Sequence, residues 1–496
     1  MNDSSMSPMD PERLARAFEF LLELRTQIVK EADELFERWR PTIRRRTFVP
    51  SALNLLRYVV FRRRDLSSLQ GELALLGLSS LGRGEPRVLA NLDAVLATLG
   101  VLAGVDAKRI PSRPRPSRFY LGERLLERDT RALFGPPRLT RAGRIMVTLP
   151  SEAALEEDFV LRLAQRGADC FRINCAHDDR AAWSRMILHV RRAAALTERR
   201  LPIVMDVAGP KVRISHASRE GGRVHVGDEI RLVSTPGPTI KGKERPIEIQ
   251  ASEPTLLERV RVGDSLAIDD GKVRAHVEST APGYAVLRVR TAAEHGVRLR
   301  SGKSINAPGV TLALDALTEK DLADLDFVGR EADLVGYSFV QSEDDVRKLQ
   351  LELAQRAGRV PPLILKIETE KAVRALPEIM LAAAGERPAA VMIARGDLAV
   401  EIGYLRLAEI QEEILWLSEA AHIPVIWATQ VLEHLVKKGL PTRAEITDAA
   451  MGERAECVML NKGPYVAEAV GVLDDLLSRM ARHQYKKTPT LRPLHF

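Results

Sequence analysis

The sequence predicts an α/β protein built around a closed (β/α)₈ barrel (a TIM barrel), with a small inserted β domain and an N-terminal helical region. Three observations support this fold class. From residue 144 onward, eight short apolar segments alternate with longer helical segments. These short segments are apolar throughout, as is typical of parallel strands covered on both faces. One connection, after the third strand, is much longer than the others and contains short alternating runs separated by glycine and proline.

Residues 1–110 are predicted to form the helical region, because apolar residues recur there at helical spacing. The first helix is expected to begin near DPERLARAF, where an acidic residue and a proline provide a typical start. Residues 111–143 are predicted to be a linker, since the run PSRPRPSRF is proline-rich and polar. We expect the helical region to pack under the barrel or to pair subunits.

The barrel itself is predicted over residues 144–213 and 301–496. Its strands are expected at IMVTL, CFRINC, PIVMDV, LVGYSFV, LILKIET, AVMIARGD, PVIWATQ and CVMLNK. A helical segment follows each of these strands except the third. Eight such units indicate a closed barrel better than an open sheet.

The long connection at residues 214–300 contains the segments DEIRLVS, SLAIDD, VRAHVES and AVLRVRT. Short alternating segments between glycines and prolines are typical of a small antiparallel β domain. The connection leaves the barrel after the third strand, at the face where barrel enzymes carry out their chemistry. We therefore expect this inserted domain to act as a lid.

The composition is that of a globular protein, and we expect a cytoplasmic one. No apolar run approaches the ~18 residues that span a membrane, and the start lacks the pattern of a secretory signal. The three cysteines show neither CxxC spacing nor an even number, so neither a disulfide framework nor a cysteine metal site is expected. The net charge of +7 comes from basic residues dispersed among acidic ones, which favours solvated helix faces over nucleic-acid binding and would also suit a small anionic substrate. No membrane partner is expected.

Polar and charged side chains end six of the eight predicted strands. Lys366 and Glu368 stand two residues apart at the end of an apolar strand, so their side chains point to the same side. The other strand-end residues are Arg172, Asn174, Asp206, Ser338, Asp397 and Thr429. Since the carboxyl ends of barrel strands meet at one rim, we expect these side chains to converge.

The pair of Lys366 and Glu368 by itself could be a core salt bridge, because burying either charge alone is costly. Convergence of six strands favours a functional site instead. Glu368 and Asp397 offer hard oxygen ligands for Mg²⁺ or Mn²⁺, and Arg172 and Lys366 can neutralise phosphoryl oxygens. The turn ARGDL begins a helix whose amides could grip a carboxylate or phosphate, whereas no Walker A or GxGxxG loop is present.

Six longer motifs carry a family resemblance. In chain order they are FRINCAH, MDVAGPKVR, INAPGVTLALDALTEKD, KIETEKAVRALPEIM, VMIARGDLAVEI and WATQVLEHLVKKGLPTRAEITDAA. The first three are similar to RLNFSHG, DTKGPEIR and VNLPG…LTEKD of pyruvate kinase. The others resemble that family's KIEN segment, its metal-and-substrate turn and its ATQMLESM…PTRAE signature. From about Arg144 to the C-terminus, the chain therefore resembles pyruvate kinase.

The resemblance implies that phosphoenolpyruvate and ADP are converted to pyruvate and ATP with Mg²⁺ or Mn²⁺. It assigns Lys366 to the phosphoryl group in flight, and Glu368 and Asp397 to the divalent metal. Thr429, with the amides of Gly396 and Asp397, would hold the substrate, and Thr429 would lie near the proton delivered to the enolate. The remaining implied contacts are Arg172 and Ser338 for the substrate, and Arg213, His177, Lys303 and Asn174 for the nucleotide.

The chain departs from the family at the potassium site. The family's Asn, Ser, Asp and Thr ligands correspond here to Asn174, Ala176, Asp206 and Val207, so two side-chain oxygens are missing. Lys211 stands where the family often has glutamate. Its ammonium could replace the monovalent cation beside Asp206 and Asn174, as in the potassium-independent members. We therefore predict that K⁺ is not required.

Two rim loops also differ from the family, since TLPSEA replaces TIGPAS and MLNKGP replaces MLSGET. The chain ends after the eighth helix, so the family's C-terminal effector domain, and control by sugar phosphates through it, is not expected. A homo-oligomer is expected.

Two other functions stay open. A metal-dependent lyase or aldolase acting on pyruvate-like acids would need the carboxylates, but neither the lid nor Lys366. A non-catalytic regulator that binds phosphoenolpyruvate and signals through the N-terminal helices would agree with the altered loops.

Overall fold

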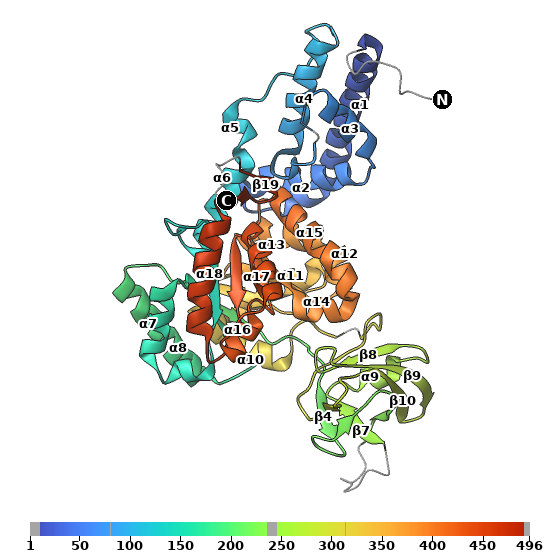
Figure 1. The fold of residues 1–496 in the computed structure, drawn as a ribbon, viewed down its shortest axis with the longest axis vertical. Coiled ribbons are helices and arrows are strands. Elements are labelled where there is room, and N and C mark those ends of the chain that lie inside the picture. Colours follow the sequence, from blue (N-terminus) through green and yellow to red (C-terminus); the bar gives the residue numbers. More distant parts are fainter. Residues whose placement is uncertain (1–9, 80, 236–245, 313, 491–496) are drawn as a thin grey trace.

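The computed structural model describes residues 10–79, 81–235, 246–312 and 314–490. Figure 1 shows three parts along the long axis, with the N-terminal helices at one end, the barrel in the middle and the inserted β domain at the other end. The ends of the predicted N-terminal region and barrel (residues 1–9 and 491–496) and part of the predicted insertion (residues 236–245) lie outside the described residues.

Eight parallel strands close into a barrel, which confirms the predicted fold class. Their order is β1-β17-β16-β15-β14-β13-β3-β2, so strands that follow one another in the barrel are always neighbours. The strands are β1 (Arg144–Thr148), β2 (Cys170–Asn174), β3 (Ile203–Asp206), β13 (Leu334–Tyr337), β14 (Leu363–Ile367), β15 (Ala389–Ala394), β16 (Val425–Ala428) and β17 (Cys457–Leu460). Nearly every residue of these strands is buried, because helices cover the outside and side chains fill the inside.

Helices form the outer layer of the barrel (Figure 1). They are α7 (Glu157–Arg166), α8 (Arg180–Thr197), α10 (Glu319–Glu331), α11 (Glu343–Ala357), α12 (Glu370–Arg374), α13 (Leu376–Glu386), α14 (Arg395–Ile402), α15 (Tyr404–Ala420), α16 (Glu433–Lys438), α17 (Arg443–Met451) and α18 (Val466–Met480). Thr318 and Thr442 start α10 and α17 with capping boxes, so the sequence itself marks these helix ends. A short hairpin of β18 (Gln484–Tyr485) and β19 (Thr488–Pro489) follows α18.

The predicted linker at residues 111–143 is wrong, because it contains the helices α5 (Pro116–Phe119) and α6 (Leu121–Phe134). Leu133 and Phe134 at the end of α6 are buried in the apolar cluster inside the barrel. This cluster includes residues that begin strands, such as Cys170 and Leu334. Helix α6 therefore closes the N-terminal end of the barrel, opposite the rim. The linker is predicted from the proline-rich run before α6. The apolar residues at the end of α6 find their packing partners only in the folded barrel.

The insertion forms a seven-stranded sheet in the order β12-β8-β9-β10-β6-β7-β4. Its strands are β4 (Ile214–Ala217), β6 (Glu229–Val233), β7 (Ile247–Ala251), β8 (Ser265–Ile268), β9 (Val273–Ala281), β10 (Tyr284–Thr291) and β12 (Ile305–Asn306). A pair of β5 (Arg223–Val224) and β11 (Val297–Arg298) and the helix α9 (Thr255–Arg259) complete it. The insertion has an apolar core of its own. It continues past the predicted end at residue 300, because β12 pairs with β8.

The N-terminal region contains α1 (Pro11–Trp39), α2 (Val49–Arg62), α3 (Ser67–Leu75) and α4 (Val88–Leu102). Short 3₁₀ helices lie in this region at Arg40–Thr42, Arg46–Phe48 and Glu85–Arg87. Two more lie in the barrel, at Ser151–Ala154 and Gly452–Arg454. Helix α2 packs against both α1 and the barrel helices α13 and α15. The buried Asn54 amide on α2 donates to the carbonyls of Glu85 at 2.7 Å and Ala420 at 2.9 Å. The helical region is therefore joined to the barrel by buried polar contacts as well as by apolar packing.

His422, which follows α15, is a second buried polar contact between the two parts. Its Nε2 donates to the carbonyl of Pro86 at 3.0 Å, and its Nδ1 accepts from the Ser51 hydroxyl at 2.8 Å. The neutral imidazole in this tautomer satisfies both contacts. Burial lowers the pKa of His422 to about 4.

A His422→Gln variant is expected to lose less stability than the wild type on acidification. The His422 contribution is complete above the ordinary pKa of 6.5 and is lost as the pH falls toward about 4, because the unfolded chain binds a proton that the folded chain rejects. Between about pH 7 and 4.5, the wild type should lose roughly 2.5 kcal/mol more than the variant. Urea unfolding at both pH values measures the difference, and an identical pH dependence of the two proteins would contradict the prediction.

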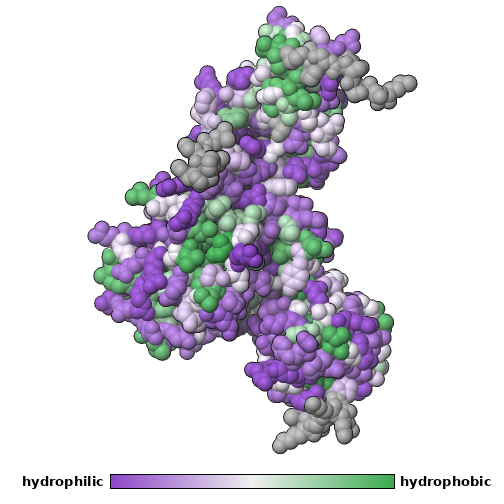
Figure 2. Space-filling model, in the orientation of Figure 1, coloured by the Kyte–Doolittle hydropathy of each residue, from purple (hydrophilic) through white to green (hydrophobic). Residues whose placement is uncertain are grey.

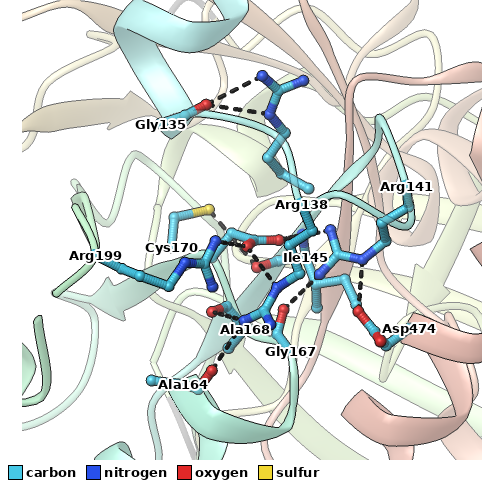
Figure 3. A network of polar contacts seen from close by, with 12 residues as sticks. Gly135, Arg138, Arg141, Ile145, Ala164, Gly167, Ala168, Cys170, Arg199 and Asp474 are labelled. Carbon is cyan, nitrogen blue, oxygen red and sulfur yellow. Dashed lines mark hydrogen bonds and ion pairs between the residues drawn. The ribbon is translucent and has the colours of Figure 1, made fainter. Parts of the chain in front are cut away.

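A charged network fastens the segment before β1 to the barrel (Figure 3). Asp169, which precedes β2, is almost completely buried and pairs with Arg138 at 3.2 Å, Arg141 at 2.7 Å and Arg199 at 2.6 Å. Burial opposes its negative charge, but Arg141 and Arg199 outweigh burial and lower the pKa of Asp169. Figure 3 shows Arg141 reaching Asp474 on α18, which its Nε meets at 2.7 Å. One carboxylate thus holds two arginines of the segment before β1 and a third that follows α8.

The surface in Figure 2 is mostly hydrophilic, with an apolar area beside α18. Val472 on α18 and Tyr465 just before it are both exposed. Within the described ranges, no helix is long and apolar enough to cross a membrane.

Candidate active site

Lys366 on β14 lies at the centre of a buried polar cluster at the rim. Its Nζ donates to Ser338 Oγ at 2.7 Å, and lies 3.0 Å from Glu368 Oε1 and 3.4 Å from Asp206 Oδ2. These partners stand at or just beyond the ends of β3, β13 and β14, which are neighbouring strands. Burial works against the charge on Lys366, but the carboxylates of Glu368 and Asp206 raise its pKa. Lys366 therefore carries a positive charge at neutral pH.

Asp206, the last residue of β3, is fully buried. Its Oδ2 accepts from Arg172 Nε at 2.7 Å, and Arg172 also donates to the Thr148 hydroxyl at 3.1 Å. Burial disfavours the ionised carboxyl, but Arg172 and Lys366 lower the pKa of Asp206. A β-carbon at Gly336 would lie 1.8 Å from Asp206 Oδ1, so only glycine leaves room for this carboxylate.

Glu368 and Asp397 form the carboxylate pair that could hold a metal. Glu368 Oε2 accepts from the backbone N–H of Phe339 at 2.6 Å, which fixes the side chain. Burial raises the pKa of Glu368, Lys366 lowers it, and the negative charge of Asp397 raises it further. A divalent cation would relieve this repulsion between the two carboxylates.

The two carboxylates suit Mg²⁺ or Mn²⁺ better than a metal ion whose ligands all come from the protein. No group of three or more His, Cys, Asp and Glu residues that could hold a metal exists in the part of the chain that the structure describes. Magnesium commonly takes one or two protein carboxylates and completes its coordination with water and substrate phosphate. The residues present therefore fit a metal that is bound together with an anionic substrate.

Lys211 connects the insertion to this carboxylate pair. Its Nζ donates to Asp397 Oδ1 at 2.6 Å and to Asp270 Oδ1 at 3.3 Å. Asp270 lies in the turn between β8 and β9 and accepts from the Ser304 hydroxyl at 2.8 Å. Burial opposes the charge of Lys211, but Asp397 and Asp270 raise its pKa. The ammonium of Lys211 thus links Asp270 of the inserted domain to Asp397 at the rim.

Helix α14 begins at the rim beside Thr429. The backbone N–H of Gly396 donates to Thr429 Oγ1 at 2.7 Å. Because Oγ1 accepts this bond, the hydroxyl hydrogen of Thr429 points elsewhere and can reach a ligand. The first-turn amides of α14 add a partial positive charge that suits a carboxylate.

Further basic residues follow β2 and β17 and precede β4. Burial lowers the pKa of His177, and the positive charges of Lys462, Arg213 and Arg172 lower it further, whereas Asp178 raises it. Arg213 Nη1 donates to the carbonyl of Gly302 at 2.9 Å. This flank of the site therefore suits a chain of phosphates.

The other two residues expected at the nucleotide have local partners. Asn174 Oδ1 accepts from the backbone N–H of Ala176 at 3.1 Å. Lys303 pairs with Asp269 at 2.9 Å, and its carbonyl accepts from the N–H of Ile214, next to Arg213. The structure therefore places Lys303 at the base of the insertion and Asn174 at the end of β2.

The barrel and the candidate site both lie in a segment that is similar to known proteins. Residues 140–470 match the family model described as pyruvate kinase, barrel domain. The chain belongs to the pyruvate kinase family. The resemblance that the six motifs indicate is therefore confirmed, and the matched segment contains each residue assigned above to substrate, metal or nucleotide.

Three relatives show the extent of the similarity to pyruvate kinases. The chain is 32% identical over 351 residues to Pyruvate kinase 2 of Synechocystis, which covers 69% of this chain and 57% of that protein. It is 29% identical over 349 residues to the pyruvate kinase of Thermotoga maritima, covering 68% and 70%. It is 31% identical over 358 residues to that of Mycobacterium tuberculosis, covering 71% and 72%. The chain thus spans little more than half of the first relative and about 70% of the other two.

The structure differs from the sequence-based expectation for Lys211. Sequence comparison within the pyruvate kinase family places its ammonium beside Asp206 and Asn174. The structure puts it on Asp397 and Asp270 instead. The charge of Asp206 is already balanced by Arg172 and Lys366, which both pair with its Oδ2.

Three residues near the candidate site were not assigned from the sequence patterns. Lys462, in the loop after β17, could have been found as a basic residue directly beyond the eighth strand. Asp270 lies in the insertion, and only the fold brings it to the rim. Arg395 belongs to the ARGDL turn, but its side chain contacts β16.

Proposed function

We propose that this chain is a phosphotransferase of the pyruvate kinase type, which converts phosphoenolpyruvate and ADP to pyruvate and ATP with a divalent metal and without K⁺. The observation that carries the proposal is the charged ammonium of Lys366, 3.0 Å from Glu368 and 2.7 Å from Ser338 at the barrel rim. Phosphoryl transfer depends mainly on positioning and on neutralising charge in the transition state. A fixed cation next to a metal-binding carboxylate supports both requirements.

In the proposed reaction, a terminal phosphate oxygen of ADP forms a bond to the phosphorus of phosphoenolpyruvate while the bond to the enol oxygen breaks. The enolate that remains takes a proton at its methylene carbon and becomes pyruvate. Lys366 and Arg172 would stabilise the negative charge on the phosphoryl group in flight. Ser338 would contribute by holding the ammonium of Lys366 in place.

The other residues would bind and orient the reactants. The Thr429 hydroxyl and the amides of Gly396 and Asp397 would hold the substrate carboxylate, with Thr429 near the proton delivered to the enolate. Glu368 and Asp397 would hold Mg²⁺ or Mn²⁺, which neutralises phosphoryl and enolate oxygens when bound. The nucleotide phosphates would contact the group of Arg213, His177, Lys303, Asn174 and Lys462.

An assay of the purified full chain tests this function directly. Phosphoenolpyruvate, ADP and MgCl₂ are supplied, and pyruvate and ATP are measured together. Equal amounts of both products, formed only with ADP and metal, are expected. Calorimetric binding of phosphoenolpyruvate without any product would favour the non-catalytic regulator. Release of pyruvate from a larger oxo acid without ADP would favour a metal-dependent lyase or aldolase.

The initial rate of pyruvate formation is expected to be the same in potassium chloride and in tetramethylammonium chloride at equal ionic strength. Arg172 and Lys366 already neutralise Asp206, and Ala176 and Val207 provide no side-chain oxygen for a cation. Rates measured across a series of K⁺ concentrations check this, and strong stimulation by K⁺ would contradict it.

A cytoplasmic location and a homo-oligomeric state remain predictions.

A further inference from the structure

Arg395, the first residue of α14, lies against β16 although it belongs to the rim motif. Its side chain is only 9% exposed. Its Nε donates to the carbonyl of Ala428 at 3.0 Å, and its Nη2 donates to the carbonyl of Thr429 at 2.8 Å. The guanidinium also lies over the ring of Trp427, 4.3 Å from the ring centre. One side chain thus contacts three consecutive residues at the end of β16.

Asp448 on α17 fixes this guanidinium from the other side. Arg395 Nη1 pairs with Asp448 Oδ1, and Nη2 donates to Oδ2 at 2.9 Å. A two-point pair between an arginine and a carboxylate defines both the position and the plane of the guanidinium. The donors that Arg395 directs at the two carbonyls are therefore held in a set orientation.

The backbone that Arg395 holds is strained. Thr429 has a φ of 63°, and Gln430 follows with a φ of 56°. Left-handed backbone of this kind is unfavourable for a β-branched residue and costs about 1–3 kcal/mol. Surrounding contacts must therefore stabilise it. Two of them come from adjacent residues, since Arg395 binds the Thr429 carbonyl and the Gly396 N–H binds the Thr429 hydroxyl at 2.7 Å.

We propose that Arg395 and Asp448 are positioning residues that keep Thr429 in the left-handed conformation and so aim its hydroxyl at the substrate. This inference rests on the proposed function, in which Thr429 contacts the substrate and lies near the transferred proton. Among the described residues, the side chain of Arg395 forms its hydrogen bonds and ion pairs with Ala428, Thr429 and Asp448, and none of these is assigned to the metal or the nucleotide. Loss of Arg395 or Asp448 should therefore act through Thr429 on turnover, and leave the KM values for ADP and Mg²⁺ unchanged.

Single variants give the first test. Arg395→Met should lower kcat about 100-fold, because a displacement of about 1 Å at a reacting group costs that much. Asp448→Asn keeps the shape but removes the charge, and should lower kcat about 10-fold. Arg395→Lys should restore only part of the loss, since one ammonium cannot reproduce the planar set of donors. A folded Arg395→Met protein with wild-type kcat would overturn the proposal.

The double variant with Thr429→Ala separates positioning from a general structural role. If Arg395 acts through Thr429, then Arg395→Met should lower kcat no further once the hydroxyl is absent. An equal loss in both backgrounds would overturn the proposal. Melting temperatures identify variants that fail to fold, and Asp448→Asn replaces Arg395→Met in the double variant in that case.

Crystal structures of Arg395→Met and Asp448→Asn distinguish this inference from the proposed function. A Thr429 φ that stays near 63° in both variants would overturn the positioning role, whether or not the wild type makes pyruvate. A displaced Thr429, together with a wild type that makes no pyruvate, would refute the proposed function and retain the positioning role.

Discussion

Lys366→Met is expected to lower pyruvate formation about 1,000-fold, because in the proposed function it removes the cation that faces the transferred phosphoryl group. Methionine has a similar length but no charge, so the barrel packing around β14 should be preserved. Asp206 and Glu368 would lose a shared partner that lies 3.4 Å from Asp206 Oδ2 and 3.0 Å from Glu368 Oε1. Binding of phosphoenolpyruvate should weaken far less than turnover, since the charge matters most when the phosphoryl group is in flight.

The measurement is kcat and KM for phosphoenolpyruvate at saturating ADP and Mg²⁺. Lys348→Met is the matched control, because Lys348 is a surface lysine on α11 that pairs with the exposed Asp315. Its kcat should equal that of the wild type. If Lys366→Met kept more than about a tenth of the wild-type kcat, Lys366 could not be the main cation of the transition state.

Asp169→Asn is expected to lower the free energy of unfolding by about 4 kcal/mol. The substitution keeps the shape of the side chain but leaves Arg138, Arg141 and Arg199 facing one another without their shared negative charge. Arg141 would keep Asp474 as an acidic partner. The pKa of Asp169 is held below its usual range, so its contribution is present at neutral pH and is lost only as the pH falls through the lowered pKa.

Urea unfolding at neutral pH measures this effect through the shift of the midpoint. Asp326→Asn is the matched control, because Asp326 pairs with Arg180 at 2.8 Å and Arg330 at 2.9 Å but is 34% exposed. This partly exposed carboxylate should contribute less than about 1 kcal/mol. If both variants unfolded at the same urea concentration, the ion pairs of Asp169 would not stabilise the attachment of the segment before β1 to the barrel.

Much of the fold could be predicted because its signals are local. Strands such as β14 and β15 are continuous apolar runs, and the barrel follows from eight of them separated by helices. The candidate residues could be placed because parallel strands end at one rim, which brings Lys366, Asp206 and Ser338 within contact of one another.

The interior end of α6 could not be predicted in the same way. Leu133 and Phe134 look like ordinary apolar residues in the sequence, and their place inside the barrel depends on strands that follow later in the chain. The contact between His422 and Ser51 joins residues 371 positions apart. No local pattern indicates such a pairing, because its two partners belong to separate helical segments.

The sequence by itself determined the barrel, its family and the set of charged residues at the rim, since periodicity and motifs depend on neighbouring residues. Only the tertiary structure decided which cation meets which carboxylate. Lysine and arginine side chains are long and flexible, so Lys211 can reach Asp397 and Asp270, and Arg395 can turn toward β16. Their partners are chosen by burial and by the charges already paired in the folded site, which are properties of the assembled barrel and its insertion.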